Sequence, residues 1–165
     1  MEADAWLARL KRLDVTVAYP FLLAAYADMV RGALTADQLV ATLDTVESYL
    51  VRRFVCGVAT HGLNKVFTPL YQQVKREADF VEGTKTHLAS RACPRDDEFR
   101  DRLESTRLYG NGERRTKTAF NLGRLEAALG HKEPVDLTGM QVEHVMPQWR
   151  RSRDRCWSRT AAVRR

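Results

Sequence analysis

The sequence contains no apolar run of about 18 residues, the length that a membrane-spanning helix needs. The nearest candidate, residues 15–27, is interrupted by Pro20 and preceded by Asp14. Glu2 and Asp4 stand where a signal peptide would carry basic residues. We therefore predict that residues 15–27 form a buried helix rather than a signal peptide.

Cysteine is also scarce. Cys56, Cys93 and Cys156 are odd in number, and no two of them have C-x-x-C spacing. This favours a reduced, cytoplasmic setting over secretion. No internal repeat is visible, and 44% hydrophobic with 29% charged residues excludes a disordered chain, a collagen-like chain and a coiled-coil rod. The 165 residues are enough for one domain with a buried core.

The net charge of +6 is unevenly distributed. Residues 1–148 contain 20 Lys and Arg against 20 Asp and Glu, whereas residues 149–165 contain seven arginines and one acid. The sequence therefore describes a neutral body with a basic tail, and the overall charge says little about the body.

Apolar spacing predicts a mainly α protein. The clearest helix follows a capping box at Thr35–Gln38 and carries one apolar stripe from Leu39 to Val58, with Gly57 and Gly62 near its end. Pro20 is placed to open an earlier helix, and Gly32 to end it. The predicted helices are 2–13, 20–31, 36 to about 57, 65–79, about 97–108 and 114–129.

Two segments of the body are ambiguous. Pro69 lies inside the predicted helix 65–79, which Asn64 can cap, so either Thr68 is the true cap or the helix kinks at Pro69. Residues 80–95 are polar and rich in turn-forming residues, and we predict a loop or a weak helix there.

The pattern changes to alternation after Pro134. Residues 141–146 predict a strand that Pro147 closes, and this strand needs a partner to be stable. It places the carboxylate of Glu143 next to the imidazole of His144. At a twisted or bulged strand end, such a pair suits phosphodiester hydrolysis, because a carboxylate holds a divalent metal and an imidazole takes a proton from water.

The hexapeptide Glu143–Gln148 has a simpler interpretation, which is favoured when these six residues are considered alone. A histidine flanked by valine and methionine is often only a half-buried side chain with its hydrogen bonds satisfied.

Several segments in order along the chain carry a resemblance to a known family. They are Glu47–Gly57, Leu63–Phe67, Pro94–Phe99, Leu108-Tyr109, Leu125-Glu126 and the final Glu-His-x-x-Pro-Gln at 143–148. From about Leu34 to Gln148, roughly two-thirds of the chain, the sequence resembles the C-terminal domain of GmrSD-type modification-dependent restriction endonucleases. That domain belongs to the His-Me finger, or HNH-like, nucleases.

The resemblance implies roles for individual residues. His144 corresponds to the general base, Glu143 to an acid that binds a divalent metal (Mg²⁺ or Mn²⁺), and the substrate would be foreign or modified DNA. Arg52 and Arg53 match a family Arg-Arg pair to which no role is assigned, and contact with phosphates or acids is one interpretation of it. The simpler expectation is that both arginines face solvent or a carboxylate of the same chain.

The sequence departs from the family after Gln148. A His-Me finger continues with a second strand and a helix that supply an Asn and a further metal ligand, but residues 149–165 contain neither His nor Asn. We therefore expect a helical body at 1–133, an incomplete ββα hairpin at 134–148 and a basic, disordered tail at 149–165. The chain is expected to be a truncated nuclease that is weakly active or inactive.

The basic tail admits three interpretations. Its abrupt change of composition suggests out-of-frame coding, whereas a charge run of this kind is most often a solvated, disordered end. Alternatively, Arg150, Arg151, Arg153 and Arg155, together with two tryptophans, form a nucleic-acid arm that neutralises phosphates and stacks on bases.

Two functional classes therefore remain open. The first is a metal-dependent DNA endonuclease. The second is a non-catalytic helical module that binds DNA or docks on a separate N-terminal restriction subunit. A chain without function is a third possibility.

Overall fold

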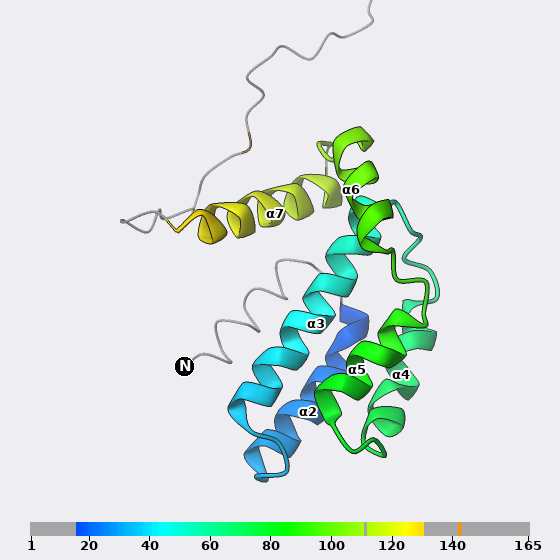
Figure 1. Ribbon diagram of the computed structural model, residues 1–165, viewed down its shortest axis with the longest axis vertical. Coiled ribbons are helices and arrows are strands. Elements are labelled where there is room, and N and C mark those ends of the chain that lie inside the picture. The colour runs from blue at the N-terminus through cyan, green and yellow to red at the C-terminus, as the bar shows by residue number, and fades with distance from the viewer. Residues whose placement is uncertain (1–15, 111, 131–141, 143–165) are drawn as a thin grey trace, which may run out of the picture.

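The computed structural model describes residues 16–110, 112–130 and 142 (Figure 1). All regular elements in these ranges are helices, which confirms the mainly α class. They are η1 (Thr16–Ala18), α2 (Tyr19–Val30), α3 (Ala36–Val55), α4 (Leu63–Val74), α5 (Phe80–Ala89), α6 (Asp96–Ser105) and α7 (Glu113–Leu129). The predicted helix 2–13, most of the predicted hairpin 134–148 and the tail 149–165 lie outside the described residues.

Helix α2 is the buried helix predicted for the apolar stretch near residue 20. Pro20 lies in its first turn, where a missing N–H costs nothing, and Phe21 and Leu22 are almost fully buried. Its one buried acid, Asp28, accepts a hydrogen bond from the Tyr71 hydroxyl at 2.7 Å. The hydrogen bond from Arg31 lowers the pKa of Asp28 below its usual value. None of the described helices has the length and apolar character that a bilayer crossing demands.

Helix α3 forms the long axis of the bundle and begins as predicted. The Gln38 N–H donates to the Thr35 hydroxyl oxygen at 3.1 Å, and the Thr35 N–H donates to Gln38 Oε1 at 2.9 Å. The helix ends at Val55, and Gly57 then adopts a left-handed φ of 67°, which glycine accepts without strain.

The sequence offers Asn64 or Thr68 as the cap of the helix that contains Pro69, and α4 begins before both. Its first residue is Leu63, directly after Gly62 at φ 90°, so neither Asn64 nor Thr68 is the cap. Pro69 lies inside the helix, although an interior proline costs about 3 kcal/mol. Phe67 and Leu70 on either side of it are almost fully buried, so tertiary packing holds the helix together across the proline.

Helix α5 decides between the two alternatives predicted for 80–95, because Phe80–Ala89 is a helix. Asp79 caps it, with its carboxylate accepting from the N–H groups of Val81 and Glu82. Its buried face consists of Phe80, Gly83, Thr84 and Leu88, and it packs along α3. The Thr84 hydroxyl donates to the Phe80 carbonyl at 2.8 Å, so this polar side chain can be buried without an unpaired donor.

An aromatic cluster occupies the centre of the bundle formed by α2, α3, α4 and α5. Phe21 stacks on Phe80 with ring centroids 6.1 Å apart, and Tyr49 meets Phe67 edge to face, also at 6.1 Å. Both geometries are favourable for aromatic pairs. Each of the four helices therefore contributes one aromatic ring to the core of the bundle.

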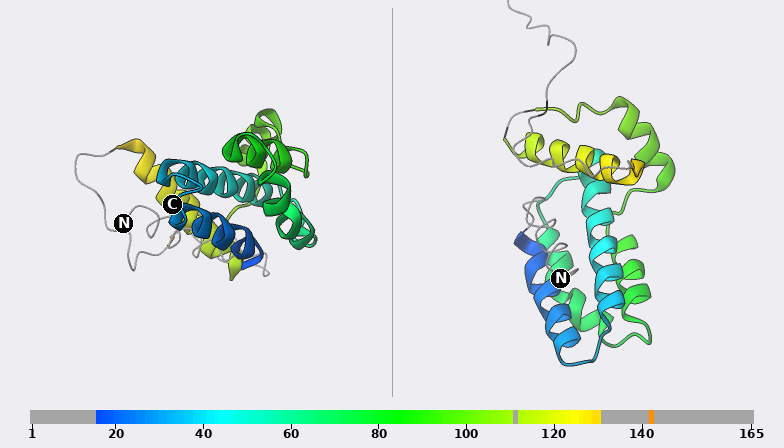
Figure 2. Two further views of the ribbon diagram at one scale, coloured as in Figure 1. Left: turned by 90° about the horizontal axis from the view of Figure 1, so that it is seen from below. Right: turned by 90° about the vertical axis from the view of Figure 1, so that its left-hand side faces the viewer.

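Helices α6 and α7 lie beyond this bundle, at the C-terminal end of α3. Helix α7 crosses that end of α3 instead of running along it (Figures 1 and 2). Arg124 of α7 forms an ion pair with Glu47 of α3 at 2.7 Å, and the Glu47 side chain is only 7% exposed. This crossing places the first turns of α7 beside the last turns of α3.

Candidate nucleic-acid interface

The residues that the sequence predicts to be catalytic, metal-binding or DNA-binding lie outside the described ranges. They are the predicted base His144, the predicted metal ligand Glu143 and the predicted DNA-binding arginines Arg150, Arg151, Arg153 and Arg155. Within residues 16–110 and 112–130, no group of three or more His, Cys, Asp or Glu side chains is arranged to hold a metal ion. The described residues contribute a different set of polar groups, at the C-terminal end of α3.

The two adjacent arginines of α3 have different environments. Arg52 pairs with Asp96 of α6 and donates to the Pro94 carbonyl at 3.2 Å, so the expectation of an intrachain carboxylate is confirmed for it. Arg53 corrects that expectation, because its side chain is buried and pairs with no acid among the described residues. It is 8% exposed and donates to the carbonyls of Arg91, Ala92 and Ala59.

Arg53 thereby fixes two loops to the end of α3. Its Nη1 holds the segment after α5, where Ala92 has a left-handed φ of 50°, and its Nη2 reaches the Ala59 carbonyl at 2.7 Å. The Tyr49 hydroxyl donates to the same Arg91 carbonyl at 2.8 Å, and the Arg53 guanidinium lies over the Tyr49 ring. The loop 56–62 is held in place by these contacts.

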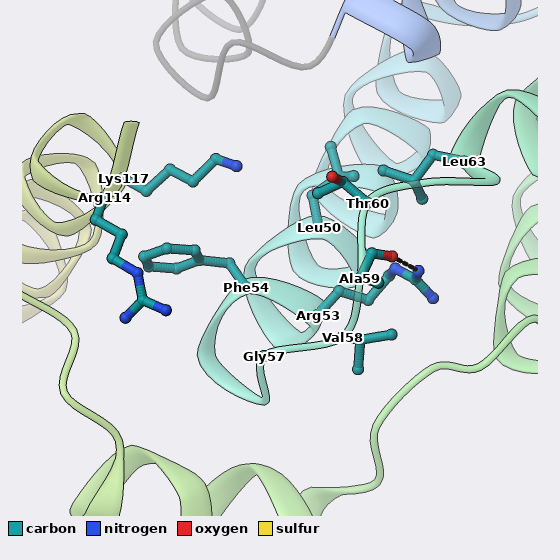
Figure 3. Close-up of a pocket in the computed structure, with 10 residues that line it drawn as sticks. All are labelled: Leu50, Arg53, Phe54, Gly57, Val58, Ala59, Thr60, Leu63, Arg114 and Lys117. Carbon is teal, nitrogen blue, oxygen red and sulfur yellow. Dashed lines mark hydrogen bonds between the residues drawn. The ribbon is translucent and has the colours of Figure 1, made fainter. Parts of the chain in front are cut away.

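A cavity of about 250 Å³ opens between this loop and α7 (Figure 3). Leu50 and Phe54 of α3 form one wall, and Arg114 and Lys117 of α7 face them. The remaining lining residues are Arg53, Gly57, Val58, Ala59, Thr60 and Leu63. The cavity is therefore made by one continuous stretch, residues 50–63, and by the start of α7, which lies far from it in sequence.

The described lining residues give this cavity a positive charge. Three of them are cationic and none is acidic. The Lys117 ammonium lies 5.5 Å from the centre of the Phe54 ring, in a cation–π contact, and the residue is only 6% exposed. The Arg53 guanidinium turns away toward the Ala59 carbonyl, so Arg114 and Lys117 are the cations that face Phe54 (Figure 3).

Arg114 is held in place by the chain that precedes α7. Its Nη1 donates to the Arg107 carbonyl at 2.8 Å, and the Thr118 hydroxyl donates to the Leu108 carbonyl at 2.7 Å. A guanidinium has five N–H donors, so a single carbonyl leaves donors for a ligand. The sequence carried one signal for this site, since Arg114 and Lys117 are three residues apart and share a helix face.

A second hollow, of about 470 Å³, lies where α3, α6 and α7 meet, and it is mainly apolar. Leu122 and Leu125 of α7 contribute to it and are 48% and 60% exposed. These two leucines of α7 are therefore only partly covered by the described residues. The buried positions of α7 are instead Lys117, Thr118 and Phe120.

Comparison of the chain with models of protein families, with curated proteins and with solved structures finds no match.

Proposed function

We propose that the chain belongs to a metal-dependent DNA endonuclease of the HNH-like type, with a helical body that supports a ββα element containing Glu143 and His144. One observation supports the proposal: the first of the segments that carry the resemblance contacts both the second and the third. Arg52 of the first segment pairs with Asp96 and lies 5.4 Å from the Phe99 ring in the third, and Tyr49 meets Phe67 of the second.

The contact between the first and third segments matters because it joins residues far apart in sequence; Arg52 and Pro94, which also share a hydrogen bond, are 42 positions apart. A chance likeness in sequence gives no reason for such residues to touch, whereas a shared fold does. The Leu108 carbonyl, in a further segment, accepts a hydrogen bond from Thr118 of α7, and Arg124, the residue before Leu125-Glu126, pairs with Glu47 of the first segment. Helix α7 ends at Leu129, and the Glu-His hexapeptide is the next feature of the resemblance along the chain.

The chemistry assigned to the hexapeptide follows from its side chains. Imidazole is the side chain best suited to accept a proton from water near neutral pH, so His144 is the proposed base. The Glu143 carboxylate is the hard oxygen donor that Mg²⁺ prefers, and with the described residues offering no metal cluster it is the donor that we assign. When bound, the ion would neutralise charge on the scissile phosphate and the leaving oxygen.

The test is cleavage of supercoiled plasmid DNA by the full chain in Mg²⁺ or Mn²⁺. We expect slow nicking that stops in EDTA and falls by at least about 100-fold in His144→Ala, as is usual when a general base is removed. His61→Ala is the matched control, because His61 is an exposed histidine in the loop before α4 and should have no effect. Cleavage that persists unchanged in His144→Ala would refute the proposed role.

A second candidate is a non-catalytic DNA-binding module, and the cationic α3–α7 cavity favours it. On this proposal DNA binding survives His144→Ala at full strength, and no variant or metal yields cleavage. Binding weakens steeply as salt rises, because phosphate contacts release counterions.

A further inference from the structure

We propose that the outer face of α2 binds a second copy of this chain, with the two α2 helices antiparallel across a two-fold axis. The α2 face consists of Leu23, Tyr26, Ala27 and Val30. This contact involves no residue of the proposed nuclease site or of the α3–α7 cavity, so its test stands apart from theirs.

Helix α2 lies at the outside of the bundle. It packs on α3 and α4, and both views of Figure 2 show it at the edge of the helical body. The α2 face lies on the side away from the core, since its members are three or four residues apart and none is among the buried residues of the helix. Those buried residues are Phe21, Leu22, Ala25 and Asp28.

The exposed side of α2 differs from that of a typical surface helix. Its exposed residues are Pro20, Leu23 and Val30, and all three are apolar. Leu23 and Val30 are 63% and 67% exposed. A helix that is apolar on every side is normally buried, so the α2 face indicates an interface. The neighbouring helix α4 exposes only polar residues, which are Asn64, Lys65, Thr68 and Gln72.

The lack of charge on the α2 face favours a second copy over a lipid surface. The one charged residue of α2 is Asp28, which is buried, and Arg31 directly after the helix pairs with it. A two-fold axis brings the same face of two copies together, so a self-associating face must avoid charge. A helix that binds a membrane surface carries lysine or arginine beside its apolar stripe, and α2 contains neither.

The α2 face is complementary to itself in an antiparallel arrangement. With the two-fold axis between Tyr26 and Ala27, Leu23 lies opposite Val30 of the partner subunit. Tyr26 then lies opposite Ala27 of the partner subunit, so a large side chain meets a small one, as packed helices require. Each contact occurs twice because of the symmetry.

The size of the α2 face sets the expected affinity. The 12 residues of α2 extend over about 18 Å, so the contact is smaller than the roughly 800 Å² per partner of a standard interface. The body at residues 1–148 has no net charge to oppose association. We therefore expect a weak dimer with a Kd in the micromolar range.

Sedimentation velocity on the full chain, at concentrations from about 1 to about 200 μM, measures this dimer. Leu23→Glu and Val30→Lys should each raise the Kd at least about tenfold, because each places a charge against an apolar side chain. Both positions are exposed, so the helical content by circular dichroism should be unchanged. Leu125→Glu is the matched control, since it places the same charge at a position of α7 that is 60% exposed, and should change the Kd by less than about twofold.

A mixture of the two variants tests the antiparallel arrangement. In a mixed dimer the glutamate of the Leu23→Glu chain lies opposite the lysine of the Val30→Lys chain, and the other pair of positions keeps its native leucine and valine. The mixture should therefore form dimers at concentrations where each variant alone is monomeric. Loss of folding in either variant would not produce this rescue.

Three results overturn the inference. The first is a wild-type chain that stays monomeric at every concentration, as expected if another part of the chain, a different protein or a lipid surface covers the α2 face. The second is a dimer that Leu125→Glu disrupts and Leu23→Glu does not. The third is a mixture of Leu23→Glu and Val30→Lys that is no more dimeric than either variant alone.

Discussion

Adjacent residues of α3 differ in what surrounds them, and Arg52 and Arg53 are the clearest case. The Arg52 side chain is 27% exposed, and its partner Asp96 is 81% exposed, so water screens their ion pair. Arg53 is buried and is the donor to three backbone carbonyls. The sequence predicts a helix across both residues, but it treats them alike because their side chains are identical.

This contrast predicts different losses of stability. Arg53→Met leaves three carbonyls without that donor and should lower the free energy of unfolding by roughly 3 kcal/mol. Arg52→Met, the matched control, loses mainly a screened pair and one carbonyl contact, and should cost about 1 kcal/mol. Urea denaturation followed by circular dichroism measures both. Equal losses for the two variants would contradict the assigned roles.

Whole elements were predicted well wherever the apolar residues repeat regularly. Helix α3 follows its predicted cap and stripe, and α7 begins at Glu113, one residue before the prediction. The sequence leaves 80–95 open between a loop and a weak helix because two of the four buried residues of α5 are Gly83 and Thr84, which do not look apolar. Glycine is required at position 83 by the close approach of the turn after α4, which sequence spacing does not reveal.

Gly83→Ala tests this explanation. A Cβ at position 83 would lie 2.8 Å from Glu77 Cγ and 3.0 Å from Glu77 Cβ, so the helix or the turn must shift. Overpacking costs about 1–3 kcal/mol, against about 1 kcal/mol gained from helix propensity, so we expect a net loss of about 1 kcal/mol. Thermal unfolding should show part of this loss recovered in Gly83→Ala combined with Glu77→Ala. If Gly83→Ala alone raises the melting temperature, the contact with Glu77 is not the reason for a glycine at position 83.

At the scale of the whole molecule, the bundle of α2, α3, α4 and α5 is separate from the layer formed by α6 and α7. The bundle shares one aromatic core, whereas α6 has no buried residue and α7 buries only a few within the described part of the chain. The cavity lies at the junction of these two parts, between the end of α3 and the start of α7.

Hydrogen exchange should report this division. Backbone amides in the middle of α7 are expected to exchange at least about tenfold faster than those in the middle of α3, because fewer apolar contacts oppose local opening of α7. Equal protection of α3 and α7 in the free protein would contradict the division.

The sequence by itself determined the mainly α class, the capping box at Thr35, the opening of α2 at Pro20 and the end of α3 near Gly57. These features depend on neighbours within about one or two helical turns, whose spacing is written in the chain. It also nominated Glu143 and His144, which remain a prediction. Only the tertiary structure decided that Arg53 is buried, that α5 is a helix and not a loop, and that Arg114 and Lys117 face Phe54. Each of those outcomes depends on which distant segments pack together, and this cannot be predicted from the local spacing of apolar residues.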